Sequence, residues 1–307
     1  MLKKVIAVCG PTASGKTALA IEIAKRFDGE IVSCDSMQIY KYMDIGTAKA
    51  TSDEQRAVKH HMIDFLEPKV KYSVADFAVR ARDCIDDIIT RGKTPILAGG
   101  TGLYLDSILN NIAFDDFGSD PKFREEMELL AEKEGNDAVH KLLLEKDSQA
   151  AQKIHPNNLR RVIRALEVCH LTNKTFTEVN KESRREAVYD ALIFAIDADR
   201  EILYNRINER VDRMMKEGLV DEVKRLCDMG IDRNTTAMQA IGYKEVLEYL
   251  EGKLNIDEMT ELIKQESRRY AKRQLTWFRR NEKINWVRPN ENDGMKKIFE
   301  KCSEFLD

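Results

Sequence analysis

The 307-residue chain lacks any apolar run long enough to cross a bilayer, and its N-terminus lacks the pattern of a secretory signal. Its six cysteines show neither Cys-x-x-Cys spacing nor a metal-ligand pattern, which argues against a disulfide framework and a cysteine-based zinc site. It also has no internal repeat, low-complexity segment or proline-rich linker. We therefore expect a cytoplasmic globular protein with reduced thiols and no membrane association.

The chain also lacks a large excess of either charge, because its 50 Lys and Arg residues nearly balance its 53 Asp and Glu residues and leave a net charge of −3. The distribution is uneven, however. Residues 115–150 carry eleven acidic and five basic side chains, residues 157–185 seven basic and three acidic, and residues 264–283 eight basic and two acidic. The two basic segments indicate a polyanionic partner that the whole-chain balance hides.

The first motif is GPTASGKT at residues 10–17. It lies between an apolar run at 2–9 and a segment with helical spacing, which is the strand–loop–helix context of a phosphate-binding loop. Glycines let backbone N–H groups turn toward anionic oxygens, Lys16 adds a mobile charge, and the Thr17 hydroxyl suits Mg²⁺. The predicted phosphate-binding residues are Gly10, Thr12, Ala13, Ser14, Gly15, Lys16 and Thr17. The loop alone does not distinguish a nucleoside triphosphate from another diphosphate.

Two further polar turns follow short apolar runs, at 30–34 and 94–98, with a predicted helix at about 74–91 between the runs. Asp35 ends the first run, and Thr101 lies in the Gly-Gly-Thr-Gly turn after the second. Because ligands bind at the carboxyl ends of parallel strands, we expect both residues to share a cleft with the phosphate loop. Asp35 can hold Mg²⁺ through water or accept a proton from a nucleophile, and the Thr101 hydroxyl can donate to a leaving-group oxygen.

Strand signals stop after about residue 113. Residues 121–185 have charged helical patterns, an apolar run at 192–197 predicts another strand, and helical spacing continues to about residue 283. We predict an α/β fold with a P-loop NTPase-like parallel sheet core flanked by helices, residues 1–113 plus 190–307. An all-helical insertion domain, residues 114–189, interrupts this core.

Arginines recur at helical spacing in two places. Arg160, Arg161 and Arg164 share one helix face and would present positive charge to a phosphate backbone or a splayed base. Arg210 and Arg213 lie three residues apart and suit bidentate phosphate contact, although spacing alone fits a solvated charged face better.

A basic row with interleaved aromatic residues lies near the C-terminus. Lys264, Arg268 and Lys272 follow each other at four-residue intervals, and Tyr270 and Trp277 recur at seven. This pattern suits RNA through phosphate charge and base stacking, and it fits equally a core-packed aromatic stripe with a solvated outer face.

Six blocks of the sequence resemble the bacterial tRNA dimethylallyltransferases, also called tRNA isopentenyltransferases. They are GPTASGKT at 10–17, DSMQIYKYMDIGTAK at 35–49, GGTGLY at 99–104, HPNNLRRVIRALEV at 155–168, MQAIGYKE at 238–245 and RRYAKRQLTWFRR at 268–280. They occur in the family's order and span nearly the whole chain. The blocks at 35–49 and 155–168 together are the most specific part of the resemblance.

The resemblance implies transfer of a dimethylallyl group from dimethylallyl diphosphate to N6 of an adenosine in tRNA. That adenosine is 3′-adjacent to the anticodon (position 37), in tRNAs that read codons beginning with U. Diphosphate leaves and Mg²⁺ assists, so the loop would bind a prenyl diphosphate although such loops are often described as ATP-binding. The helical insertion would grip the anticodon stem-loop, and nothing in the sequence demands more than a monomer.

The resemblance also implies roles for individual residues. Asp35 would be the general base for the adenine N6, and Thr101 would donate to the bridging oxygen of the leaving diphosphate. Lys16, Thr17 and Arg210 would contact diphosphate and Mg²⁺. The implied tRNA contacts are Asp35, Ser36, Met37, Gln38, Thr101, Arg124, Arg160, Arg161, Val162, Ile163 and Arg164.

Three other hypotheses are compatible with parts of the sequence. A P-loop kinase of a small metabolite or nucleotide explains the loop and Asp35 but gives no role to residues 155–168 and 268–280. An enzyme that prenylates free adenosine nucleotides shares the chemistry but does not need the basic segments. A non-catalytic RNA-binding protein with a vestigial phosphate loop would tolerate the loss of Asp35.

Overall fold

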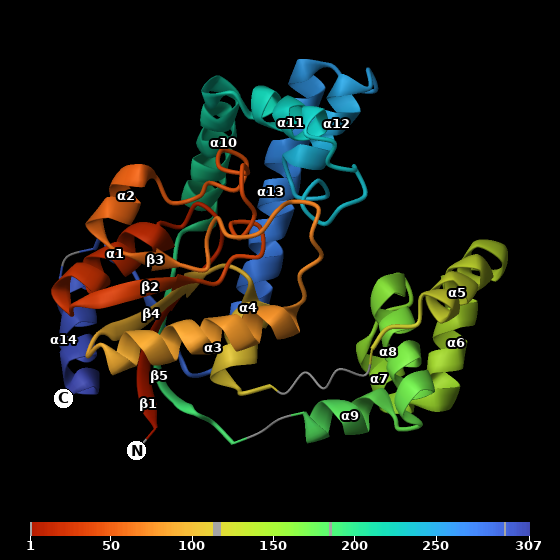
Figure 1. Cartoon of the computed structure of the whole chain (residues 1–307), viewed down its shortest axis with the longest axis horizontal. Helices are drawn as coiled ribbons and strands as arrows, with labels where there is room; N and C mark the ends of the chain where they lie inside the picture. The colour runs from red at the N-terminus through yellow and green to blue at the C-terminus, as the bar shows by residue number, and fades with distance from the viewer. Residues whose placement is uncertain (1, 113–117, 184–185, 292) are drawn as a thin grey trace. The chain divides into compact units, whose positions relative to one another are not determined.

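The computed structural model describes residues 2–112, 118–183, 186–291 and 293–307. The chain divides into two compact units: Met1–Leu109 with Ala187–Asp307, here called the core unit, and Asn110–Glu186, here called the helical unit. The core unit contains a sheet flanked by helices (Figure 1). The sequence placed the limits of the insertion at 114 and 189, a few residues later at each end.

A six-stranded sheet forms the centre of the core unit, counted over the described residues, in the order β3-β2-β4-β1-β5-β6. All neighbouring strands run parallel. The strands are β1 (Lys3–Cys9), β2 (Gly29–Ser33), β3 (His60–His61), β4 (Thr94–Gly99), β5 (Tyr189–Ile196) and β6 (Ile284–Val287). The predicted parallel sheet is confirmed, and the carboxyl ends of β2, β4 and β1 lie next to each other at one edge.

Helices of the core unit lie on both faces of this sheet and also extend away from it. They are α1 (Lys16–Arg26), α2 (Ser52–Ala57), α3 (Val74–Thr90), α4 (Gly102–Leu109), α10 (Arg200–Glu217), α11 (Leu219–Asp228), α12 (Tyr243–Leu250), α13 (Ile256–Phe278) and α14 (Gly294–Leu306). Alternate side chains of β1 separate the two layers, since Ile6 and Val8 pack with α1 and α14, whereas Val5 and Ala7 pack with α3 and α4. Burial on both faces explains why β1 is apolar from Val5 to Cys9.

The four predicted strands correspond to β1, β2, β4 and β5, and their positions are confirmed. The expectation that the core finishes with helices near residue 283 was wrong, because Ile284–Val287 forms β6 beside β5 and α14 follows it. The two-residue strand β3 was also missed. Both strands are too short for their residue spacing to be distinguished from a loop.

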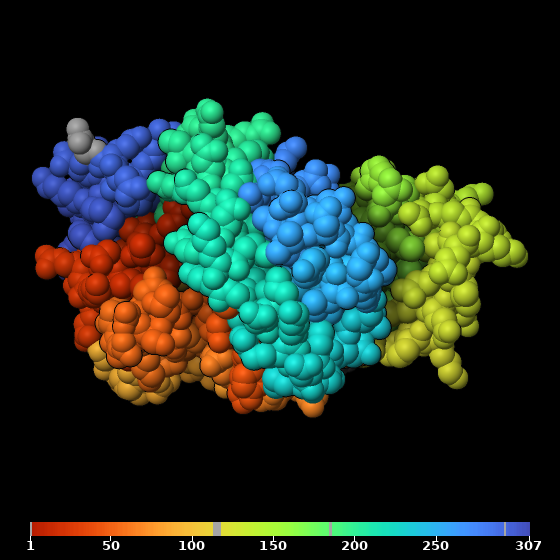
Figure 2. Space-filling view, turned by 90° about the horizontal axis from the view of Figure 1, so that it is seen from above, coloured from red at the N-terminus to blue at the C-terminus, as the bar shows by residue number. Residues whose placement is uncertain are grey.

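A second apolar cluster joins the loop after β2 to the C-terminal helices. Ile39, Tyr40 and Met43 from this loop pack against side chains of α11 and α12, including Val223 and Val246. The space-filling view shows α10 and α11, in green and teal, next to α13 in blue (Figure 2). The loop that carries Asp35 therefore packs on helices far away in the sequence.

The helical unit contains α5 (Pro121–Glu134), α6 (Asn136–Lys146), α7 (Ser148–Lys153), α8 (Leu159–Thr172) and α9 (Phe176–Glu182). Val139, Leu143, Val162 and Leu166 form a core of its own. Over the described ranges of the whole chain, no helix combines the length and apolar character needed to span a membrane.

Candidate active site

The phosphate loop connects the end of β1 to the start of α1. Gly10 has φ 145°, Ala13 φ 61° and Gly15 φ 94°, so the backbone reverses direction within a few residues. Gly15 is the N-cap of α1, and no side chain in the described part of the chain caps this helix. Its first N–H groups are therefore suited to an anion, which the positive end of the helix dipole also favours.

Ser14 adds a further indication of an anion site. Its side chain is buried, and its Oγ has no hydrogen-bond partner among the described residues. A buried hydroxyl without a hydrogen-bond partner costs free energy, and an oxygen of a bound phosphate would accept a hydrogen bond from it.

Two cations lie against the loop. The guanidinium of Arg210, on α10, donates from Nη1 to Thr12 Oγ1 at 2.9 Å. Burial and the charge of Arg210 lower the pKa of Lys16 to about 8, against the opposing effect of Asp35. Burial and the charge of Arg213 likewise lower the pKa of Arg210. Mutual repulsion of this kind is relieved when an anion binds between the cations.

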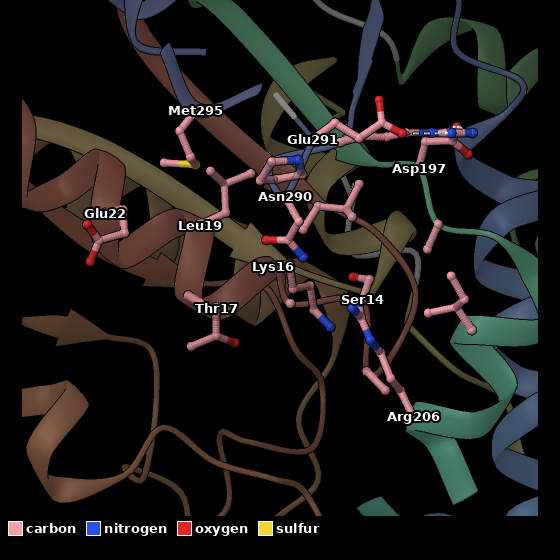
Figure 3. A pocket seen from close by; sticks show the side chains of 18 of the residues that line it. Ser14, Lys16, Thr17, Leu19, Glu22, Asp197, Arg206, Asn290, Glu291 and Met295 are labelled. Carbon is pink, nitrogen blue, oxygen red and sulfur yellow. Dashed lines mark hydrogen bonds and ion pairs between the residues drawn. The ribbon is translucent and has the colours of Figure 1, made fainter. Parts of the chain in front are cut away.

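A cavity of about 1010 Å³ opens on one side of the loop. Ser14, Lys16, Thr17 and Arg206 face it (Figure 3). Arg210 and Arg213 also belong to its wall. Arg210 is half-buried beside the phosphate loop, whereas Arg213 is exposed on the same helix.

Asp35 follows β2 and is half-buried. Its Oδ1 accepts hydrogen bonds from the backbone N–H groups of Met37, at 2.9 Å, and Gln38, at 3.4 Å. Its Oδ2 accepts none from the described residues. The turn thus fixes the carboxylate through one oxygen and leaves the other available for a substrate proton.

Thr101 lies beside this turn. Its Oγ1 accepts from the N–H of Ser36 at 3.1 Å, and its own N–H donates to the Cys34 carbonyl at 3.2 Å. Gly99 makes this approach possible, because a Cβ at that position would lie 2.1 Å from the carbonyl oxygen of Cys34. The ends of β2 and β4 therefore carry Asp35 and Thr101 next to each other, as the sequence predicts.

A second cavity, of about 300 Å³, brings eight of the predicted residues together. From the predicted set it is lined by Thr12, Lys16, Thr17, Asp35, Ser36, Met37, Gln38 and Arg210. Thr101 is linked to it through Ser36. Lys16, Thr17 and Arg210 line both cavities. An anion on the phosphate loop would thus have the carboxylate of Asp35 on the side of the smaller cavity.

Sequence reasoning gave no role to Gln274 and Gln239, which line this smaller cavity, and considered Tyr270 only for base stacking or core packing. Burial and the charge of Asp35 raise the pKa of the Tyr270 phenol to about 12, although hydrogen bonding with Thr101 acts in the opposite direction. Gln274 and Tyr270 lie within the block at 268–280, which is part of the family resemblance. That block could have pointed to both residues, but the resemblance implied no role for either.

The remaining aromatic residues of that block belong to the core. Phe278 is buried against the sheet, and Trp277 donates its indole N–H to Asp106 at 2.9 Å. Of the basic row, Lys264 pairs with Asp212 at 2.8 Å, while Lys272 is exposed. The core-packed alternative is therefore correct for Trp277 and Phe278, whereas Tyr270 faces the cavity.

The residues at 160–164 lie on helix α8 of the helical unit and differ in their exposure. Arg160 and Arg161 are exposed. Val162 and Ile163 are buried in the core of the unit, at 0% and 3% exposure, so their side chains anchor the helix that presents the arginines. The predicted contact of these two residues with tRNA stays a prediction.

Arg124 and Arg164 converge on Glu167, which is fully buried. Arg124 donates from Nε and Nη2 at 2.7 and 2.8 Å, and Arg164 donates from Nη1 at 2.5 Å. Burial opposes ionisation of Glu167, but the hydrogen bonds from both arginines outweigh it and lower its pKa. Both arginine side chains stay partly exposed, at 44% and 42%, and one carboxylate holds their guanidinium groups.

Comparison with known proteins gives a consistent family. The sequence model of the family described as IPP transferase matches residues 38–281. A tRNA dimethylallyltransferase from Acetivibrio thermocellus is 49% identical over 306 residues, which are 99% of this chain and 98% of that protein.

Two solved structures are also similar. The full-length tRNA isopentenylpyrophosphate transferase of Bacillus halodurans is 43% identical, with a TM-score of 0.75 over 99% of this chain and 97% of that chain. A eukaryotic dimethylallyltransferase, described as acting on tRNA, is 29% identical, with a TM-score of 0.84 over 99% of this chain and 79% of that chain.

Proposed function

The chain belongs to the IPP transferase family, and we propose that it transfers a dimethylallyl group from dimethylallyl diphosphate to tRNA. The acceptor is N6 of the adenosine 3′-adjacent to the anticodon, in tRNAs that read codons beginning with U, and the enzyme acts as a monomer. The observation that carries this proposal is the cavity that joins the phosphate loop to Asp35.

The diphosphate binds to the N–H groups at the start of α1, to the Ser14 hydroxyl, and to Lys16 and Arg210. These groups neutralise the negative charge that develops as the bond between the allylic carbon and the bridging oxygen breaks. In this proposal, Thr101 donates a hydrogen bond to that bridging oxygen. A better leaving group makes the allylic carbon more reactive toward a weak nucleophile.

The nucleophile is the exocyclic amine of adenine, whose lone pair is delocalised into the ring. A bond forms between N6 and the allylic carbon, and the diphosphate leaves with the electron pair of the broken C–O bond. The proton on N6 passes to Asp35, whose Oδ1 is fixed by Met37 and Gln38. The adenine has to leave its stack to reach this carboxylate.

Magnesium fits the residues present but has few protein ligands. No group of three or more His, Cys, Asp or Glu residues suited to a metal occurs among the described residues. Thr17, which lines both cavities, would contribute one hydroxyl, and diphosphate oxygens and water would complete the coordination, as is common for Mg²⁺. Bound Mg²⁺ supplies charge neutralisation of the leaving diphosphate.

The helical unit supplies the main tRNA contacts. Arg160 and Arg161 are exposed cations, and Glu167 orients Arg124 and Arg164. Contacts of this type to phosphates position an RNA without reading its sequence. Ser36, Met37 and Gln38 line the cavity that receives the flipped adenine.

The kinase hypothesis accounts for the phosphate loop but not for a family match that covers the helical unit. The enzyme that prenylates free nucleotides differs from the proposal only in its acceptor, so the experiment has to vary the acceptor.

Transfer of radiolabel from dimethylallyl diphosphate should be measured with Mg²⁺, using unmodified tRNA and, in parallel, AMP as acceptor. We expect label in tRNA and none in AMP. Label in AMP alone would identify a nucleotide prenyltransferase. Label in neither acceptor, with γ-phosphate transfer from ATP to a small molecule, would refute the proposal in favour of a kinase.

A further inference from the structure

Gln274 on α13 bridges the two turns that flank the site of the leaving group. Its Oε1 accepts from the backbone N–H of Thr12 in the phosphate loop at 2.9 Å. Its Nε2 donates to the carbonyl of Gly100, next to Thr101, at 2.9 Å. The side chain is 5% exposed and lines the smaller cavity.

The packing around this bridge leaves little freedom. A Cβ on Gly100 would lie 2.1 Å from Gln274 Nε2, and a Cβ on Gly102 would lie 2.2 Å from the ring of Trp277. Helix α13 therefore lies directly against the Gly-Gly-Thr-Gly turn at two points.

Both ends of the bridge lead to groups that act on the leaving diphosphate. At one end, the hydroxyl of Thr12 accepts from Arg210, a cation of the diphosphate site. At the other end, Thr101 accepts from the N–H of Ser36, one residue from Asp35. The amide of Gln274 thus fixes the position of the phosphate loop relative to Thr101.

A glutamine matches this task because its amide offers one acceptor and one donor at the same time. A carboxylate would lose the donor to Gly100, and an apolar side chain would lose both hydrogen bonds and leave a buried N–H and C=O unpaired. Displacements of about 1 Å near reacting atoms can cost about 100-fold in rate, so the bridge has consequences for catalysis beyond stability.

We propose that Gln274 is a positioning residue that aligns Thr101 with the bridging oxygen of the diphosphate bound on the loop. This inference rests on the proposed prenyl transfer and adds to it a residue that acts through Thr101. Gln274 does not itself take part in proton transfer or in departure of the diphosphate.

The test is a double-mutant cycle with Gln274→Met and Thr101→Ala, in which single-turnover prenylation of tRNA is measured at saturating substrates. We expect each single variant to be slower by about 10- to 100-fold. If Gln274 acts through Thr101, the double variant is nearly as fast as Thr101→Ala alone. Gln265→Met, an exposed position on the same helix, is the matched control and should react like the wild type.

A double variant whose rate loss equals the product of the two single losses would refute the coupling and leave Gln274 with a structural role only. If Gln274→Met does not fold, Gln274→Glu replaces it in the cycle, because it keeps the size and the acceptor, although it adds a negative charge as it removes the donor. Failure of the wild type to prenylate tRNA in the same assay would instead refute the proposed function.

Discussion

At the scale of single residues, the charge of Lys16 is maintained at a cost to stability. Its pKa is lowered to about 8 by burial and by Arg210, whereas in the unfolded chain it titrates near the ordinary value of 10.5. Below pH 8 the lysine is charged in both states, and the folded state bears the full desolvation penalty. As pH rises from 8 toward 10.5 the folded state loses this charge first, so the penalty disappears.

This pH dependence of stability leads to a prediction for Lys16→Met. The variant should unfold at a higher temperature than the wild type at pH 7, because the buried charge is gone, and the difference should shrink above pH 8. The same variant should bind inorganic diphosphate much more weakly. A wild type that is more stable than Lys16→Met at pH 7 would show that the lysine is not penalised in the folded state.

At the scale of elements, Glu222 of α11 fixes the loop that follows Asp35. Its buried carboxylate accepts from the backbone N–H groups of Asp44, Ile45 and Gly46, at 2.9, 2.8 and 3.1 Å. It also accepts from the Tyr243 hydroxyl at 2.6 Å. Gly46 lines the smaller cavity, so this carboxylate fixes part of its wall.

We expect Glu222→Gln to loosen this loop, because an amide offers one acceptor oxygen where the carboxylate offers two. Hydrogen exchange of the amides at 44–46 should accelerate by at least about tenfold, equivalent to about 1.4 kcal/mol of local opening. Amides of β1 serve as the internal reference. Glu30→Gln, a buried carboxylate bound to Arg91 and His61, is the matched control and should leave the 44–46 amides unchanged.

The helices and strands also show which parts of the fold could be predicted from the sequence. β1 and the phosphate loop were predictable because a long apolar strand, a fixed motif and a helix follow one another without interruption. The contacts of Gln274 with Thr12 and of Glu222 with Gly46 could not be predicted, because they join residues more than 170 positions apart in the chain. Nothing local in the sequence distinguishes these two side chains from other polar residues of α11 and α13.

Similarly, the four-residue β6 was unpredictable, since its pairing with β5 exists only in the folded sheet. Arg160 and Arg161 illustrate the opposite case. Helical spacing placed them on one face of a helix, and both are exposed on α8.

At the scale of the whole molecule, the helical unit has its own core, while the cavities lie in the core unit. The proposed function thus assigns the phosphate contacts of tRNA and the chemistry to different parts of the chain. Substitutions on the exposed face of α8 should then change affinity for tRNA without altering the binding of diphosphate.

Replacing both Arg160 and Arg161 with serine should weaken tRNA binding and flatten its salt dependence. The slope of log K against log salt should decrease in magnitude by up to about two, because each arginine that neutralises a phosphate accounts for about one. The charge-matched control replaces Lys133 and Lys141, which are exposed on α5 and α6. An equal reduction of affinity in the control would indicate an effect of net charge alone, and unchanged affinity in the arginine variant would return these residues to a solvated helix face.

The proposed prenyl transfer depends most on Asp35 as the base that accepts the N6 proton. The decisive measurement is the single-turnover rate of prenyl transfer to tRNA by Asp35→Asn, with Asp44→Asn, an exposed position in the same loop, as control. We predict a loss of at least about 100-fold for Asp35→Asn, with diphosphate and tRNA affinities retained and the control near the wild type. An Asp35→Asn enzyme that transfers the dimethylallyl group at the wild-type rate would contradict the account.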